Sequence, residues 1–376
     1  MDIISSPRSS AAPTRSAPRG LLWAGAGLGI AMLAAGLVWL VAPELGPFTR
    51  RAVVLQVLLG EPGAGPLIAA ATQAALGAVT TALAVAALFS RQRAGTALAA
   101  GGLACGTATA LGFVGFNGIV LAGYLLAMTA PIAIAAAAVV FALRRPRTGW
   151  IVLVIVAVLG AVAIAGPAPV GLFYARALEG VAELGVMMAA ALLWIAFAGV
   201  WLLCGILAVA GDVGRFGRFV RRRRVAITIV AACCAVPYVI ARASWLTPWP
   251  LFGGEAVADG GPAVLITGLM LASAMLVGGI LTLGLILPWG ARFPRWVPRV
   301  GGRPIPIALA VVPASIVAAL FTAGGAESLV TTMAHGASVG DLLLSLVLPF
   351  WLWGPLLALA TWGYAQHRAA ERAAAG

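Results

Sequence analysis

The sequence predicts an all-α, polytopic membrane protein with about ten transmembrane helices and both termini in the cytoplasm. Three observations predict it: 62% of the 376 residues are hydrophobic, only 9% are charged, and the basic residues cluster between long apolar runs. A soluble domain carries about 25% charged residues, so a soluble fold is excluded. The apolar runs have the length of about 20 residues that a spanning helix needs, and they lack the alternation of barrel strands.

These runs form a single membrane domain, residues 21–364, between an N-terminal tail, residues 1–20, and a C-terminal tail, residues 365–376. The N-terminal tail is rich in Ser, Pro and Ala, so we expect it to be disordered and cytoplasmic. The first apolar run is longer than the core of a signal peptide, which has about 7 to 15 residues. We therefore expect this run to remain in the protein as a membrane anchor. The ten predicted spans are residues 21–42, 67–89, 94–116, 118–143, 149–165, 184–210, 225–245, 263–287, 305–323 and 342–364.

The arginines test this topology independently. All 24 basic residues are arginine, and basic residues favour the cytoplasmic side of a membrane. With the N-terminus inside, 20 of them fall in cytoplasmic segments and four fall outside, at Arg50, Arg51, Arg176 and Arg242. A wrong number of spans would scramble this alternation. The densest cluster, six arginines within residues 215–224, is therefore expected to be a cytoplasmic loop.

The charge pattern also indicates the partners. A net charge of +13 would suggest nucleic acid in a soluble protein, but arginines clustered between spans are explained by topology, so no nucleic acid is expected. An arginine near an anionic leaflet gains about 1 kcal/mol. We therefore expect the lipid bilayer and its cytoplasmic anionic headgroups as partners. A homo-oligomer or a larger membrane complex stays open.

The link between the eighth and ninth predicted spans, residues 288–306, is rich in Pro, Arg and Trp. Its prolines prevent a long helix and favour an extended path along the membrane surface. Tryptophan belongs at the headgroup level, and arginine reaches the phosphates. We interpret the link as a membrane-surface clamp made of Trp289, Arg292, Arg295, Trp296, Arg299 and Arg303.

Residues 225–323 contain the runs "AVPYVIARASWLTPWPLFGG" and "GLILPWGARFPRWVPRVGGRPIPIALAVVPAS". These runs resemble segments of uncharacterised multi-pass membrane proteins of actinobacteria. The resemblance implies a bacterial plasma-membrane protein. It implies no activity, substrate or catalytic residue.

Motifs for chemistry are missing from the sequence. There is no Walker phosphate loop, GxSxG or HExxH motif, and the four cysteines lie in apolar runs, where we interpret them as buried hydrophobic residues. No Asp or Glu falls in the middle of a predicted span, which disfavours a carboxylate proton relay. No catalytic residue, metal site or cofactor is therefore expected.

Charged residues near the outer face are candidate contacts for a solute or an anion. Arg242 follows Pro237 in the seventh span, where it can bind an anionic group or extend to the outer headgroups. Arg176, Glu179 and Glu183 are spaced i, i+3 and i+7, so they share one face if the segment is helical. That face is either solvated or part of an outer vestibule, and both alternatives stay open.

Prolines within spans are candidate helix breaks, because proline removes a helical hydrogen bond. Broken helices mark substrate sites in many transporters. The candidates are Pro131, Pro237, Pro313 and Pro349.

Polar residues and glycines within the spans are predicted to mediate helix packing. Gln73 of the second span can hydrogen-bond to a neighbouring helix, a contact worth about 0.6 kcal/mol on average. The spacing of Gly25 with Gly29, and of Gly102 with Gly106, permits helices to approach closely.

Three functions stay open on these grounds. The expected one is a small-solute permease or exporter with a path at the proline breaks, for a neutral, lipophilic or anionic solute. The first alternative is a non-catalytic membrane scaffold or sensor that docks partners on its arginine-rich segments. The second is a lipid-carrier glycosyltransferase-like enzyme, which would need a carboxylate base such as Glu44 or Glu61 in an outer loop.

Overall fold

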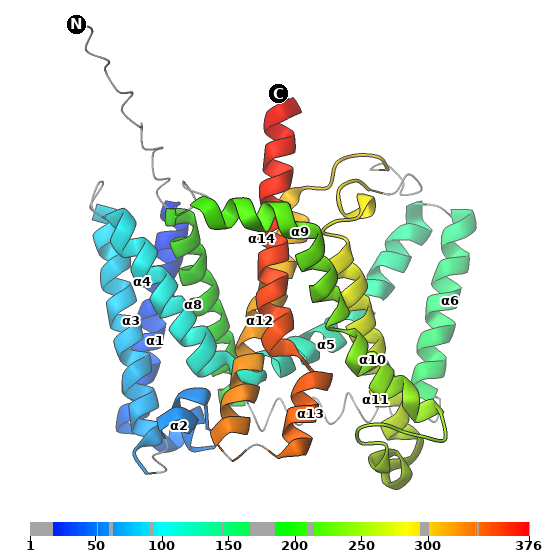
Figure 1. Ribbon diagram of the computed structural model, residues 1–376, viewed down its shortest axis with the longest axis horizontal. Helices are drawn as coiled ribbons and strands as arrows, with labels where there is room; N and C mark the ends of the chain where they lie inside the picture. The colour runs from blue at the N-terminus through cyan, green and yellow to red at the C-terminus, as the bar shows by residue number, and fades with distance from the viewer. Residues whose placement is uncertain are drawn as a thin grey trace, which may run out of the picture.

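The computed structural model describes residues 18–50, 52–59, 63–89, 94–144, 146–165, 185–209, 214–293, 301–334, 336 and 338–375. These residues are predominantly helical, and the extended pairing among them is one isolated bridge between Arg292 and Pro304. Eight segments of the described chain are long and apolar enough to cross a membrane. The chain is a multi-pass helical membrane protein (Figure 1).

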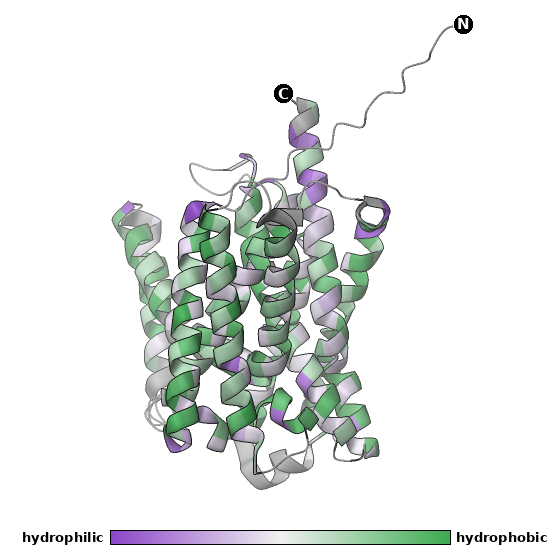
Figure 2. Ribbon diagram, turned by 90° about the vertical axis from the view of Figure 1, so that its left-hand side faces the viewer, coloured by the Kyte–Doolittle hydropathy of each residue, from purple (hydrophilic) through white to green (hydrophobic). Residues whose placement is uncertain are grey.

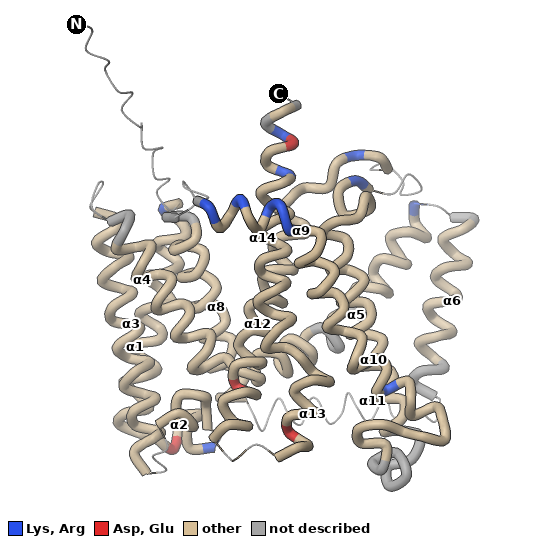
Figure 3. The backbone as a smooth tube through the Cα atoms, viewed as in Figure 1, with Lys and Arg blue, Asp and Glu red and all other residues tan. Residues whose placement is uncertain are grey.

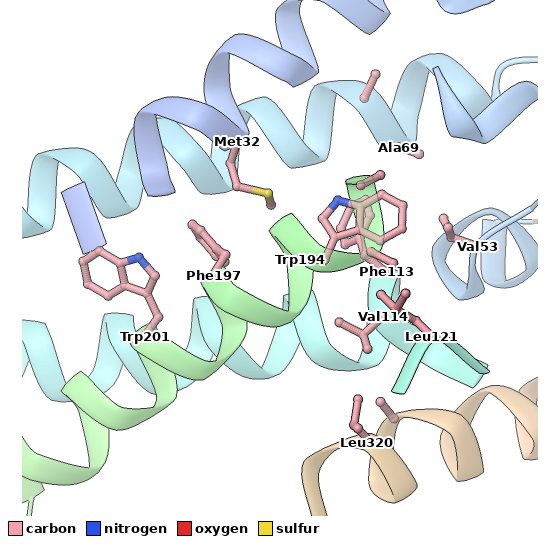
Figure 4. Packing of buried hydrophobic residues seen from close by; sticks show 14 of the residues in the cluster. Met32, Val53, Ala69, Phe113, Val114, Leu121, Trp194, Phe197, Trp201 and Leu320 are labelled. Atoms are coloured by element: carbon pink, nitrogen blue, oxygen red, sulfur yellow. The ribbon is translucent and has the colours of Figure 1, made fainter. Parts of the chain in front are cut away.

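Four helices within residues 19–209 form one bundle. They are α1 (Arg19–Val41), α3 (Gly65–Phe89), α4 (Ala94–Thr109) and α8 (Gly185–Val209). Aromatic side chains fill the core of this bundle, among them Phe113, Trp194, Phe197 and Trp201 (Figure 4). The short helix α2 (Val54–Leu59) lies at one end of the bundle, together with the 3-10 turns η1 (Pro43–Leu45) and η2 (Pro47–Thr49).

Glycines allow the helices of this bundle to approach closely. A Cβ atom on Gly36 of α1 would lie 2.7 Å from the Ala74 backbone nitrogen of α3. Likewise, a Cβ atom on Gly102 of α4 would lie 2.8 Å from the Trp201 carbonyl oxygen, and one on Gly106 would lie 2.9 Å from the Leu202 nitrogen, both on α8. The pair Gly102 and Gly106 therefore lies at a close helix contact, as its spacing predicts.

A polar contact ties three helices of the same bundle together. The Gln73 side chain of α3 is fully buried, and its Nε2 donates to the Met32 carbonyl oxygen of α1 at 3.2 Å. Its Oε1 accepts from Trp194 Nε1 of α8 at 2.8 Å. Gln73 thus makes the interhelical hydrogen bonds that its place in the second span predicts.

The second half of the chain forms a second group of helices. It comprises α9 (Gly214–Cys233), α10 (Val236–Ala243), α11 (Glu255–Leu283), α12 (Ile307–Ala334), α13 (Val339–Val347) and α14 (Phe350–Ala375). Side chains of α14 occupy its core, including Phe350, Trp353 and Tyr364. Helix α12 joins the two halves, because Leu320 and Ala323 belong to the core of the first bundle.

The fourth and fifth predicted spans correspond to α5 (Gly115–Arg144) and α6 (Pro146–Ala165). The five-residue π-helix η3 (Ala110–Val114) connects α4 to α5, so the apolar segment Ala97–Gly123 continues from one into the other. The remaining apolar pieces, Ile132–Arg144 and Thr148–Ala161, are shorter than a full span. Length and composition therefore support eight membrane spans in the described chain, and the predicted total of ten spans stays a prediction.

Charge is distributed unequally between the two sides of the helical layer. Apolar residues cover the helices along the layer (Figure 2). The basic residues gather on the side where α1 begins and α14 ends, whereas the opposite side carries sparse charges of both signs (Figure 3). Both ends of the described chain thus lie on the arginine-rich side, an arrangement typical of a cytoplasmic face.

Several boundaries differ from the sequence prediction. Residues 215–224, expected to be a loop, form the first half of α9, because arginine is a good helix former. Helix α12 continues eleven residues past the predicted end at residue 323, to Ala334. It passes through Gly325, which lies against the Trp351 backbone of α14, a close approach that only glycine permits. The predicted tail 365–375 is the helical end of α14.

Candidate functional site at the helix interruptions

Three interruptions separate helices that would otherwise be continuous in the described chain. The first lies at Gly115 between η3 and α5, the second at Cys234 and Ala235 between α9 and α10, and the third at Leu348 and Pro349 between α13 and α14. Pro237 is the second residue of α10, and Pro349 directly precedes α14. Two of the candidate helix breaks thus lie at interruptions.

The other two candidate breaks do not interrupt a helix. Pro313 lies inside α12, and the backbone at Pro131 is part of α5. A proline removes only one backbone donor, and in a membrane bundle neighbouring groups can satisfy the carbonyl that it frees. Proline alone is therefore a poor indicator of an interruption in this chain.

Glycine, rather than proline, makes the first interruption. Gly115 has φ +49°, a left-handed conformation that glycine adopts without steric cost. The backbone N–H of Phe116, which follows it, donates to Oε2 of Glu327 on α12. A Cβ atom at position 115 would collide with this carboxylate. Glycine is thus required at position 115 for two reasons: the backbone has a positive φ, and the Glu327 carboxylate leaves no room for a Cβ atom.

Sequence reasoning missed Glu327, because it ended the ninth span at residue 323. Glu327 lies seven residues before the end of α12, or about 10 Å along the axis at 1.5 Å per residue. Its side chain is half-buried, and Oε1 has no hydrogen bond or ion pair with the residues that the structure describes. The apolar residues that follow it in the sequence could have indicated the longer helix.

The second interruption borders an apolar pocket of about 510 Å³. The pocket is lined mainly by α10, the loop that follows it and the last residue of α13. Helices α10 and α13 lie in the half of the layer opposite the chain termini (Figure 1). Its lining residues are Cys233, Val236, Pro237, Ile240, Ala241, Leu251, Phe252 and Val347. Cys233 is exposed, whereas Cys105, Cys204 and Cys234 are buried, so the expectation of four buried cysteines is wrong for Cys233.

The third interruption connects the pocket to the region of Glu327. Val347, the last residue of α13, lines the pocket. Three residues later, the Phe350 ring lies 6.3 Å from the Phe116 ring and 4.5 Å from the Phe321 ring, measured between centroids. Leu348 and Pro349 thus lie between the apolar pocket and the carboxylate at the first interruption.

Arg242 holds the loop that follows α10. Its Nη1 donates to the Phe252 carbonyl oxygen at 3.1 Å, and its guanidinium lies 4.1 Å from the Trp245 ring centroid and 4.8 Å from that of Tyr238. Such cation–π contacts are favourable. Phe252 has φ +43°, which is uncommon for a residue with a side chain. Arg242 therefore positions Phe252, a pocket-lining residue, and does not line the pocket itself.

The described ends of the link 288–306 pair with each other like the neck of a hairpin, whereas residues 294–300, to which the prediction of an extended path along the surface also applies, lie outside the described residues. The Phe293 N–H donates to the Arg303 carbonyl oxygen at 3.0 Å, and the Ile305 N–H donates to that of Ala291 at 2.9 Å. Gly302, with φ +77°, supports the turn. The two described ends of the link thus lie side by side, paired through their backbones.

The far end of α14 secures the neck of this hairpin. Arg368 is buried and donates to the carbonyl oxygens of Ala291 at 2.9 Å and Ile305 at 3.3 Å, one on each side of the neck. Tyr364 donates to the Gly290 carbonyl oxygen at 2.9 Å. Of the predicted clamp, Trp289, Arg292 and Arg303 lie on the described part of the hairpin and are exposed.

Some predicted site residues lie outside the described residues. These are Arg176, Glu179, Glu183, Arg295, Trp296, Arg299 and Glu61. Glu44, the other candidate base of the glycosyltransferase-like alternative, is exposed in η1. Within the described chain, no group of three His, Cys, Asp or Glu side chains is arranged to hold a metal ion.

Comparison with known proteins adds no relative. No protein-family model matches the chain, and neither the curated proteins nor the solved structures include a match. The resemblance of residues 225–323 to actinobacterial membrane proteins stays a prediction. The helix interruptions, the pocket and Glu327 are therefore the features of this chain that point to a function.

Proposed function

We propose that the protein is a permease or exporter of a small lipophilic solute, with ten spans and both termini in the cytoplasm of a bacterium. The observation that supports this best is the location of the apolar pocket between two helix interruptions. Broken helices form the substrate sites of many transporters. The pocket is open on one side, and its volume of about 510 Å³ is large enough to hold a small molecule.

The lining of the pocket defines the class of solute. Its side chains are apolar and carry no formal charge, so a small lipophilic molecule can bind there by burying apolar surface. Arg242 lies next to Phe252 at the edge of the pocket and carries a positive charge. This location favours lipophilic solutes that also carry a negative charge.

The third interruption supplies an element that can move. Helix α13 has nine residues, and Leu348 and Pro349 separate it from α14. A short helix bounded by an interruption can reorient with few broken backbone hydrogen bonds, because most hydrogen bonds of a helix are internal. In our proposal, movement of α13 carries Val347 away from α10 and opens the pocket.

Flux of 8-anilinonaphthalene-1-sulfonate, a small lipophilic anion, tests this function. Its fluorescence reports entry into phosphatidylcholine vesicles as a slow phase after rapid binding to the outer leaflet. The full chain should accelerate the slow phase, and Ile240→Trp should remove the acceleration by filling the pocket. The matched control is Ile280→Trp, because Ile280 is similarly exposed on α11 and does not line the pocket. An unchanged slow phase with the wild-type chain would refute the proposal.

A further inference from the structure

The first half of α9 lies along the arginine-rich side of the helical layer before the helix turns into it (Figure 1). One face of this segment is fixed to α14. Val220 is fully buried and lies against Gly363, and the Phe216 ring lies 5.8 Å from the Trp362 ring. Packing against a membrane-spanning helix therefore holds the segment at the surface of the layer.

The remaining faces of the segment are exposed and combine two chemistries. Arg215, Arg218 and Arg222 are spaced i, i+3 and i+7, so they form one stripe along the helix. Phe216 and Phe219 are 59% and 55% exposed. The described residues place no carboxylate in an ion pair with these arginines. Within the described part of the chain, the segment thus presents positive charge without an ion-pair partner beside exposed aromatic rings.

We infer that this segment binds the headgroups of anionic phospholipids through Arg215, Arg218 and Arg222, with Phe219 inserted at the acyl boundary. Helices with arginines on one face and phenylalanines on another bind in the interface of a membrane. A soluble polyanion would neutralise the arginines but would leave the phenylalanine rings in water. An anionic lipid leaflet binds the arginines through its headgroups and also buries the phenylalanine rings at its acyl boundary.

This inference does not depend on the proposed transport function. It goes further than the positive-inside rule, because that rule requires only that arginines stay on one side. A lipid site requires in addition that the arginines form a stripe on a helix that is held in the plane of the leaflet.

Titration with dioctanoyl phosphatidylglycerol tests the inference on the detergent-solubilised full chain, with the unfolding temperature as the readout. Phosphatidylglycerol should raise the unfolding temperature and dioctanoyl phosphatidylcholine should not. Three Arg→Gln substitutions at positions 215, 218 and 222 should weaken the apparent affinity roughly 100-fold, since each arginine gains about 1 kcal/mol and 1.4 kcal/mol is tenfold. The control Arg144→Gln/Arg372→Gln removes two exposed arginines outside α9 and should leave the affinity within about twofold.

A second variant separates a lipid from a soluble polyanion. Phe219→Ser should weaken the effect of phosphatidylglycerol and leave binding of a short RNA oligonucleotide unchanged. Equal effects of the two lipids, or an unchanged affinity of the triple variant, would overturn the inference. Tighter binding of the RNA than of phosphatidylglycerol would overturn it as well and would assign the stripe to a soluble polyanion.

Discussion

Glu327 of α12 accepts a hydrogen bond from the backbone N–H of Phe116, a residue 211 positions earlier in the chain. This contact joins the interruption at Gly115 to the helix that connects both halves of the molecule. The amino-terminal end of a helix carries a partial positive charge, which favours a carboxylate at that place. An acid within a membrane-spanning helix is costly to bury and is usually functional, so this pair is the most informative polar contact of the described chain.

Removing the carboxylate should destabilise the protein. Glu327→Leu leaves the Phe116 N–H without its acceptor, and we expect the free energy of unfolding to fall by about 1 to 3 kcal/mol. Glu327→Gln should cost less, because its amide oxygen can still accept. Unfolding by sodium dodecyl sulfate in mixed micelles measures the difference. Equal stability of the leucine variant and the wild type would show that the contact does not stabilise the interruption.

The hydrogen bond between Gln73 and Trp194 should show measurable coupling. Gln73→Leu leaves Trp194 Nε1 without an acceptor, whereas the double variant with Trp194→Phe removes both partners. We expect a coupling energy of about 0.6 to 1.7 kcal/mol, the range found between membrane helices. A double-mutant cycle on the unfolding free energy measures it. Strictly additive effects would mean that the two side chains stabilise the bundle independently.

Close packing between α1 and α3 should depend on one glycine. Gly36→Val introduces atoms where a Cβ alone would lie 2.7 Å from the Ala74 nitrogen, and overpacking of this kind costs about 1 to 3 kcal/mol. The control is Gly27→Val on the same helix, because a Cβ at Gly27 has no atom within 4 Å. Comparing the unfolding temperatures of the two variants tests the contact. Similar losses for both would point to helix propensity instead.

The features that depend on local patterns could be predicted from the sequence. Eight spans follow from the length of the apolar runs, and the close contact at Gly102 and Gly106 follows from their spacing. The features missed depend on contacts between distant segments. The hydrogen bond of Glu327 to Phe116 and that of Arg368 to Ala291 each join residues that are far apart in the sequence. Neither bond could be predicted, because no local sequence pattern marks the residues that form it.

The helix interruptions, too, could not be predicted from local sequence patterns. Pro237 and Pro313 both lie within predicted spans, yet only Pro237 lies at an interruption. Whether proline interrupts a membrane helix depends on what neighbouring helices offer to the freed carbonyl, and a single sequence does not contain that information. The interruption at Leu348 and Pro349 lies close to the other two only because the helices pack together. This proximity could not be predicted from the sequence either.

Arg368 should protect the hairpin from proteolysis. Arg368→Gln removes the hydrogen bonds to the Ala291 and Ile305 carbonyl oxygens, so the neck should open more often and trypsin should cleave after Arg292 several-fold faster. Peptide mass analysis over time measures the rate. The control is Arg372→Gln, one turn further along α14, where the side chain is exposed. Equal cleavage rates in both variants would contradict the role of Arg368.

Cys233 should be the reactive cysteine of the folded protein. A thiol reacts with N-ethylmaleimide as its thiolate and in contact with water, and a permeation path is hydrated during part of its cycle. Cys233 is exposed and lines the pocket, whereas Cys105, Cys204 and Cys234 are buried. We therefore expect one modified cysteine in vesicles, identified by peptide mass analysis.

Two variants make this prediction specific to the pocket. Cys233→Ala should leave the folded chain unmodified, and Ile240→Trp should slow the reaction because the added ring fills the space beside the thiol. Denatured protein should react at all four cysteines. If Cys233 in vesicles stays as unreactive as the buried cysteines, the pocket is filled by lipid and not reached by water, and the solute path must lie elsewhere.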